Sequence, residues 1–144
     1  NLKNKAGVVK MYQEQYKRWL AADLQDADLN PELSKIEGND EEIKDRFAVA
    51  LKFGTAGLRG VLGAGTNRMN IYTVGAATQG LSNYLKKEFS GLDQIKVVIG
   101  HDCRNNSRKF AEISADIFSA LKIFVRLRKC LLPSVNWDAR VVLS

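Results

Sequence analysis

The fold is decided by the stretch IKVVIGHDCRNNSRKFAEISADIFSA, which occupies residues 95–120. Residues 95–100 form a short apolar run after Gly91, a pattern typical of a buried strand. Ser107 is placed to cap a helix over residues 107–120. The inward stripe of this helix would be Phe110, Ile113, Ile117 and Leu121. A buried strand followed at once by an amphipathic helix predicts a layered α/β fold.

Upstream, the chain predicts further helices. Residues 71–89 favour a long helix whose inward side chains would be Tyr72, Val74, Gly75, Thr78, Leu81, Leu85 and Phe89. Residues 8–20 favour an amphipathic helix whose inward side chains would be Val9, Tyr12, Tyr16, Trp19 and Leu20. Pro31 fits the first turn of a short helix, and residues 38–40 cap another helix over residues 41–47. Packing is the simplest interpretation of this N-terminal part.

Residues 51–62 are dense in glycine and predict two short strands joined by a tight turn. They include the sequence FGTAGLRG at residues 53–60. Phosphate chemistry requires positive charge and oriented backbone N–H groups around a dianion. Glycines let a backbone approach closely, and Arg59 can present a planar fork of donors to phosphate oxygens. A plain hairpin is the commoner explanation of such a composition, so both interpretations stay open.

A second polar group follows the predicted strand. His101, Asp102 and Arg104 emerge at its carboxyl end, where α/β folds place ligands. His101 is the only histidine, and ordinary hydrogen bonding at the strand end is a better interpretation than a catalytic base. Ser107 is explained as a cap, so we do not take it as a nucleophile. No cluster of residues has the spacing of metal ligands.

The two segments, FGTAGLRG at residues 53–60 and GHDCRNNS at residues 100–107, resemble the phosphoglucomutase/phosphomannomutase (alpha-D-phosphohexomutase) family. The resemblance covers roughly residues 12–120 of this chain. These residues correspond to the N-terminal part of the family's first α/β domain. It implies phosphoryl transfer between the C1 and C6 oxygens of a hexose phosphate, through a phosphoserine and a bisphosphorylated sugar. It also implies magnesium, held in a later domain together with the phosphoserine, so we expect no metal and no cofactor in this chain.

The resemblance also assigns site residues. It implies that Arg59 is catalytic and lies beside the phosphoserine. The residues expected to bind phosphate or support the site are Gly54, Thr55, Gly57, Gly60, His101, Asp102 and Arg104. Among them, Asp102 and Arg104 would brace the serine loop from behind.

The family's catalytic loop, Thr-Ala-Ser-His-Asn-Pro, does not occur in this sequence. A shifted reading frame offers an explanation. Residues 136–138, Asn-Trp-Asp, must be encoded AAY TGG GAY, and reading from each last nucleotide forces Leu-Gly, as in the family. The same shift over residues 124–129 permits the family's Arg-Pro-Thr-Pro-Glu. We hypothesise that a short deletion near Ala120 moved the gene out of frame, and that translation stopped before the catalytic loop.

We therefore predict a partial phosphohexomutase domain that is inactive alone, or alternatively a non-catalytic module that binds phosphate or sugar phosphate. Its fold class would be α/β, a single layered domain with a small mixed sheet packed by helices, preceded by an N-terminal helical extension. The predicted division is an extension at residues 1–46, the partial domain at residues 47–120 and a divergent tail at residues 121–144. The tail could supply edge strands at residues 122–127 and 140–143.

The net charge of +6 lies mostly in the tail, which holds five basic residues and one acid. The remainder has 17 basic and 15 acidic residues, so we expect no nucleic-acid partner. No apolar run is long enough to span a membrane, and no secretory signal is evident. Cys103 and Cys130 are interpreted as free thiols, which suggests the cytoplasm. Expected partners are a hexose phosphate, bound weakly at most, and a second copy paired through open sheet edges.

Overall fold

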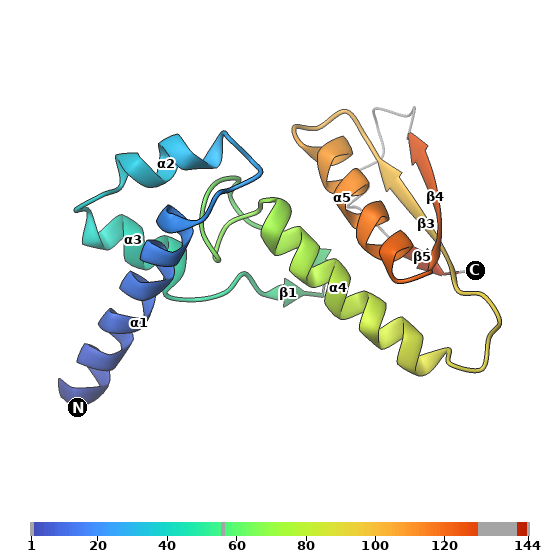
Figure 1. Ribbon diagram of the computed structural model, residues 1–144, viewed down its shortest axis with the longest axis horizontal. Coiled ribbons are helices and arrows are strands. Elements are labelled where there is room, and N and C mark those ends of the chain that lie inside the picture. The colour runs from blue at the N-terminus through green and yellow to red at the C-terminus, as the bar shows by residue number, and fades with distance from the viewer. Residues whose placement is uncertain (1, 56, 130–140, 144) are drawn as a thin grey trace. The chain divides into compact units, whose positions relative to one another are not determined.

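The computed structural model describes residues 2–55, 57–129 and 141–143 (Figure 1). Contacts within the chain divide it into two compact units. The N-terminal unit comprises Asn1–Gly54 and Leu58–Asn70, and the C-terminal unit comprises Thr55–Gly57 and Ile71–Ser144. The predicted division of the chain at residues 46 and 120 stays a prediction.

Three helices build the core of the N-terminal unit: α1 (Leu2–Ala21), α2 (Leu29–Lys35) and α3 (Asp40–Phe47). Helix α1 packs against both others. The buried apolar side chains between them are Tyr12, Tyr16, Leu29, Leu33, Ile36, Ile43 and Phe47. The rings of Tyr16 and Trp19 meet that of Phe47 edge-on, with centroids 5.8 and 5.7 Å away. The predicted packing role of this part is therefore confirmed.

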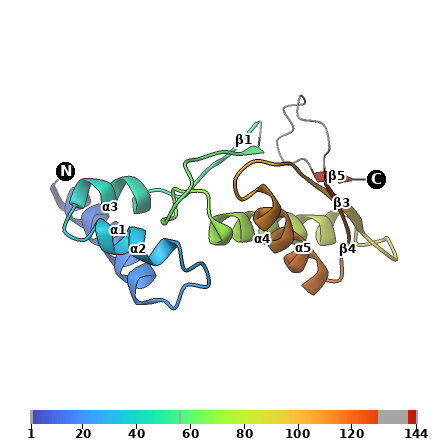
Figure 2. The same cartoon turned by 90° about the horizontal axis from the view of Figure 1, so that it is seen from above.

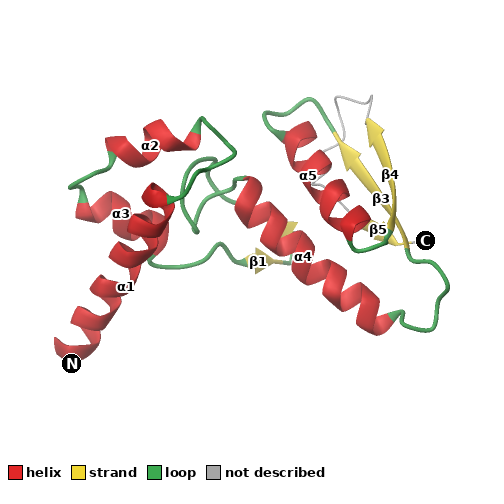
Figure 3. Cartoon of the chain, in the orientation of Figure 1, coloured by secondary structure: helices red, strands yellow, loops and turns green. Residues whose placement is uncertain are grey.

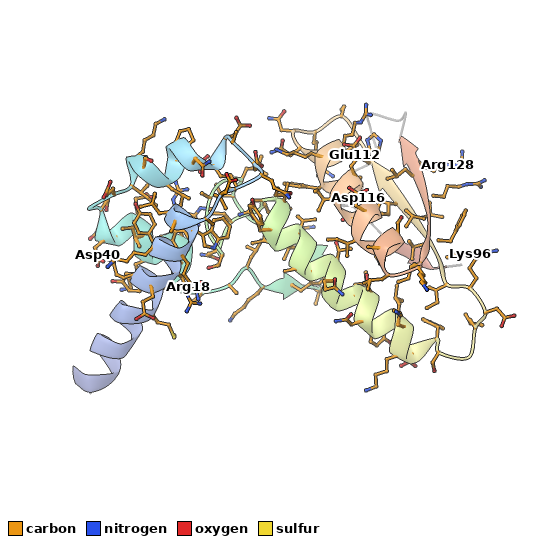
Figure 4. The ribbon with its side chains drawn as sticks, viewed as in Figure 1. Arg18, Asp40, Lys96, Glu112, Asp116 and Arg128 are labelled. Atoms are coloured by element: carbon orange, nitrogen blue, oxygen red, sulfur yellow. The ribbon has the colours of Figure 1, made fainter. Side chains whose placement is uncertain are left out.

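Polar contacts at the helix ends fix how these helices meet. The Tyr12 hydroxyl donates to Asp40 Oδ2 at 2.8 Å, at the start of α3, where Figure 4 labels Asp40. Asn39 caps α3 as predicted, because its side chain accepts the Glu42 N–H at 3.3 Å. Leu20, predicted to face inward, is instead 40% exposed, since it lies in the last turn of α1, near Ala21. The side chain of Val9 lies outside the described residues.

The glycine-rich segment forms the two short strands that were predicted. They are β1 (Phe53–Gly54) and β2 (Gly57–Leu58), and they pair as a two-stranded sheet. Gly57 has a φ of +94°, which lies in the region that favours glycine. The turn at this point therefore requires a residue without a Cβ atom.

The C-terminal unit contains α4 (Ile71–Glu88), β3 (Lys96–His101), α5 (Ser107–Ala120), β4 (Phe124–Lys129) and β5 (Val141–Leu143). The sheet order is β4-β3-β5, with β4 parallel and β5 antiparallel to β3 (Figure 3). Helix α5 packs against β3 and β4, and α4 packs against α5 (Figure 2). This mixed sheet, packed by helices, confirms the predicted α/β class. Strands β4 and β5 occupy the part of the tail where edge strands were predicted, although residue 140 lies outside the described residues.

The core of this unit lies between the sheet and its helices. Its buried residues are Leu85, Val97, Ile99, Ala111, Ala115, Phe118 and Ile123. The predicted inward stripe of α5 was wrong in part, because Phe110, Ile113, Ile117 and Leu121 are only half-buried. A Cβ atom at Gly75 of α4 would lie 3.3 Å from Ile117 Cδ1 and 3.8 Å from Ile113 Cγ2. Helix α5 thus turns isoleucines toward α4, while the stripe that includes its buried alanines packs in the core.

Within the part of the chain that the structure describes, none of the helices combines the length and the apolar character needed to cross a membrane.

Candidate phosphate-binding site

Arg59 is exposed and directly follows β2, in a segment over residues 52–60 that we call the arginine turn; the residues at its two ends are hydrogen-bonded to one loop. Before the turn, the Leu51 N–H donates to the Thr66 carbonyl at 2.8 Å. After it, the Val61 carbonyl accepts the Met69 N–H at 2.8 Å. A Cβ atom at Gly60 would lie 2.7 Å from Leu51 Cδ1, so the backbone beside Arg59 fits closely against Leu51. Arg59 is therefore an exposed residue on a backbone that is held at both ends.

The loop over residues 63–70 is itself fixed by a buried amide. Gly63 and Gly65 have φ angles of +144° and +131°, which only glycine adopts readily. Asn70 is buried, and its Nδ2 donates to the carbonyls of Gly63 at 2.8 Å and Gly65 at 2.9 Å. Asn70 was not predicted as a site residue, although a polar residue between two predicted elements was a signal available in the sequence.

The second predicted group lies in the C-terminal unit, at the end of β3. The Asp102 carboxylate accepts the Arg104 backbone N–H at 3.0 Å and Arg104 Nε at 2.8 Å. The Asp102 N–H donates to Ser107 Oγ at 3.1 Å. These contacts, above all the backbone N–H of Arg104, lower the pKa of Asp102 below its ordinary value. Asp102 therefore stays ionised, and its hydrogen bonds hold residues 102–107 in a closed loop.

One prediction about this segment needs correction. Ser107 does not cap α5: it is the first helical residue, and its hydroxyl accepts the Asp102 N–H. The cap position belongs to Asn106, in a left-handed conformation with φ of +62° and no side-chain capping bond. The hydrogen bond predicted for His101 is absent at Nδ1, which is buried and has no partner among residues 2–55, 57–129 and 141–143.

The predicted site residues fall into two groups. Gly54, Arg59 and Gly60 belong to the N-terminal unit, while Thr55, Gly57, His101, Asp102 and Arg104 belong to the C-terminal unit. Asp102 and Arg104 are brought into direct contact. Cys103, between them in the sequence, is an exposed free thiol, and Cys130 lies outside the described residues. No three His, Cys, Asp or Glu side chains in the described ranges are grouped to hold a metal ion, so these residues do not fit a magnesium site.

The fold and the arginine turn together define the class of protein: an α/β domain with an exposed arginine on a glycine-rich segment. The family is identified by a sequence match, because the family model of the phosphoglucomutase/phosphomannomutase alpha/beta/alpha domain I matches residues 50–135. The chain therefore belongs to the phosphoglucomutase/phosphomannomutase family, as the sequence resemblance indicated. The match extends past Ala120, where that resemblance was judged to end.

Curated relatives agree with this family. The chain is 41% identical to phosphopentomutase of Pongo abelii over 104 residues, which cover 68% of this chain and 17% of that protein. It is 43% identical to phosphoribomutase of Saccharomyces cerevisiae over 77 residues, covering 54% and 12%. It is 35% identical to glucose 1,6-bisphosphate synthase of Homo sapiens over 103 residues, covering 67% and 17%. The chain thus spans less than a fifth of these relatives. No solved structure matches it significantly.

Proposed function

We propose that this chain carries a sugar-phosphate-binding part of a phosphomutase, an enzyme that moves a phosphoryl group between two oxygens of one sugar. The observation that carries the proposal is the exposed Arg59 on a turn hydrogen-bonded at both ends. A fixed backbone limits the region that the Arg59 guanidinium can reach, and the guanidinium can donate two parallel hydrogen bonds to phosphate oxygens. Gly57, two residues before Arg59, has nothing within 4 Å of its Cβ position, so a ligand can approach the backbone there.

Turnover requires a group that accepts the phosphoryl, and the sequence contains no Ser-His-Asn. Neither an arginine nor a backbone N–H can replace a serine hydroxyl in that covalent step. We therefore propose that the chain alone binds a sugar phosphate without converting it. In the complete site, the Asp102–Arg104 pair would support the serine loop, since its ionised carboxylate holds residues 102–104 in one conformation.

The identity of the sugar phosphate is a separate question. The sequence resemblance implied a hexose phosphate, with transfer between C1 and C6. Two relatives are named for pentose phosphates, phosphopentomutase and phosphoribomutase, and a third is named for glucose 1,6-bisphosphate. A pentose phosphate is therefore a second candidate. A bisphosphorylated sugar is the best probe because its two phosphates offer the arginine a dianion at either end.

The test is a calorimetric titration of the purified chain with glucose 1,6-bisphosphate and with ribose 1,5-bisphosphate. We expect weak binding that Arg59→Ala reduces by about tenfold or more, since hydrogen bonds to charged groups contribute roughly 1.5–3 kcal/mol. Arg108→Ala is the matched control: it removes the same charge from α5, where Arg108 pairs with Glu112 and its side chain is 78% exposed. Absence of heat with both sugars would contradict the binding proposal.

Inactivity has its own test. A coupled assay should detect no conversion of glucose 1-phosphate or ribose 1-phosphate by the wild-type chain. Conversion that Arg59→Ala abolishes would contradict the proposal that the chain binds without turnover.

The proposal also places the protein in the cytoplasm and gives it no nucleic-acid partner. Exposed Arg126 and Arg128 lie on β4, in the tail that the reading-frame hypothesis treats as accidental. Figure 4 labels Arg128 together with Lys96 of the neighbouring strand. Binding to duplex DNA that weakens steeply with salt would count against this part of the proposal.

A further inference from the structure

A single carboxylate joins the helical extension to the loop behind the arginine turn. Glu32 Oε2, from α2, accepts the Ala64 N–H at 2.9 Å and Arg46 Nη1, from α3, at 3.0 Å. Arg46 Nη1 also donates to the Ala64 carbonyl at 3.2 Å. Ala64 is fully buried, and the Arg46 side chain is only 17% exposed. The Glu32 side chain is 39% exposed, so what distinguishes its contacts is the charge-assisted bond that it accepts from the buried Ala64 backbone.

The loop fits against these two side chains without spare room. A Cβ atom at Gly63 would lie 2.6 Å from Glu32 Oε2. A Cβ atom at Gly65 would lie 2.7 Å from the Arg46 carbonyl oxygen. The Arg46 carbonyl also accepts the Asn67 N–H at 2.9 Å. The position of the loop backbone is therefore set by Glu32 and Arg46 from the first residue of the loop to Asn67.

The loop in turn holds both ends of the arginine turn. Its Thr66 carbonyl binds the Leu51 N–H, and Met69 exchanges hydrogen bonds with Val61 and Gly63. Val61 lies two residues after Arg59 in the sequence. A displacement of the loop would thus move both supports of the turn together.

From these contacts we infer that Glu32 and Arg46 are positioning residues for Arg59. The inference rests on the proposed function of Arg59 as a phosphate ligand. Both residues lie outside residues 50–135, which match the family domain, so the helical extension would do more than pack. Its contribution is to hold the guanidinium where it meets the phosphate.

Glu42 provides a matched control within the same ion-pair group. Its Oε2 accepts Arg46 Nε at 3.1 Å, and its side chain is 47% exposed. Glu42→Gln and Glu32→Gln each remove one negative charge and weaken one contact to Arg46. Only Glu32 also accepts a backbone N–H of the loop.

The experiment measures two quantities for each folded variant, the Kd for glucose 1,6-bisphosphate and the hydrogen exchange of the Leu51, Ala64 and Met69 amides. We expect Glu32→Gln to raise the Kd by about tenfold and to speed exchange at all three amides, because small misplacements of a binding group are costly. Glu42→Gln should leave both quantities within about twofold of the wild type, since exposed ion pairs contribute little. Should Glu32→Gln fail to fold, Arg46→Lys tests the same link with the charge retained.

The outcomes separate this inference from the proposed function. If Glu32→Gln lowers the melting temperature but binds the bisphosphate as the wild type does, the pair is only structural and the inference is wrong. If the wild type does not bind the bisphosphate, the proposed function fails first. Unchanged exchange at Leu51 and Met69 in Glu32→Gln would then overturn the positioning role as well, whereas faster exchange would support it.

Discussion

The carboxylate of Asp102 holds Arg104 twice, through the backbone N–H at 3.0 Å and through Nε at 2.8 Å. Both bonds favour the ionised carboxylate, and the backbone bond is the largest cause of its lowered pKa. The Asp102 side chain is 19% exposed, whereas that of Arg104 is 55% exposed. Solvent therefore screens the ion pair, and the bond to the backbone contributes most of the stabilisation.

The pH dependence of stability follows from this lowered pKa. A carboxyl group whose pKa is lower in the folded state stabilises the protein above its unfolded pKa, ordinarily 3.8 here. That stability is lost as the pH falls from this value through the folded pKa. We expect Asp102→Asn to lower the free energy of unfolding by about 1 kcal/mol at pH 7. The difference from the wild type should shrink as the pH falls below this value.

Urea denaturation of both proteins at pH 7, 4 and 2 measures this effect. Asp93→Asn is the control, because Asp93 is an exposed aspartate in the loop before β3. It should leave the unfolding free energy within about 0.5 kcal/mol of the wild type. An Asp102→Asn deficit that is as large at pH 2 as at pH 7 would show that charge plays no part.

Two glycines, one in the loop over residues 63–70 and one in helix α4, should respond in opposite ways to substitution by alanine. Gly65 has a φ of +131°, and a Cβ atom there would lie 2.7 Å from the Arg46 carbonyl oxygen. We expect Gly65→Ala to destabilise the protein by at least about 2 kcal/mol, from backbone strain and the clash together. Gly80, exposed in α4, has nothing within 4 Å of its Cβ position. Gly80→Ala should instead stabilise by up to about 1 kcal/mol, because alanine favours helix.

Thermal denaturation of the two variants compares a loop glycine with a helix glycine. Equal melting temperatures for Gly65→Ala and the wild type would mean that the loop relaxes freely, which would also weaken the positioning role of Arg46.

Local patterns were enough to predict most of the elements. Helix α5 begins at Ser107 and ends at Ala120, as its spacing predicted, and α3 has its predicted cap at Asn39. The inner stripe of α5 was misjudged because two of its three buried residues, Ala111 and Ala115, carry little hydrophobic signal, so the pattern did not place Phe118 on that stripe. Ser107 was misjudged because Asn106 and Ser107 are both good caps, and only the backbone conformation decides between them.

The candidate site could be predicted only where its residues are close together in the sequence. Asp102 and Arg104 are two positions apart, so their contact follows from one loop. Glu32 and Ala64 are 32 positions apart, and nothing local in either segment indicates that a carboxylate meets a backbone N–H there. Contacts of this kind depend on how helices pack, which periodicity alone does not fix.

The open sheet edge leads to a third prediction. Among the described strands, β4 pairs with β3 alone, and its Leu127 and Phe124 are 43% and 51% exposed. The edge mixes these apolar side chains with the exposed Arg126 and Arg128, and its backbone groups can still pair with those of a second copy. We expect concentration-dependent dimers in analytical ultracentrifugation, weakened several-fold by Leu127→Lys because a charge opposes edge pairing. Leu92→Lys is the control, since Leu92 is 59% exposed outside the strands. A monomer at every concentration would exclude the dimer.

The shifted reading frame is tested by sequencing the coding DNA from the Ser107 codon to well beyond the Ser144 codon. In the shifted frame we expect Arg-Pro-Thr-Pro-Glu over residues 124–129, Leu-Gly over residues 136–138 and, farther on, Thr-Ala-Ser-His-Asn-Pro. Repair of the frame should then restore mutase activity that is lost when the recovered serine becomes alanine, because that hydroxyl carries the phosphoryl group. If the loop is absent from every frame, the tail that forms β4 and β5 is authentic protein, and the non-catalytic binding function takes precedence.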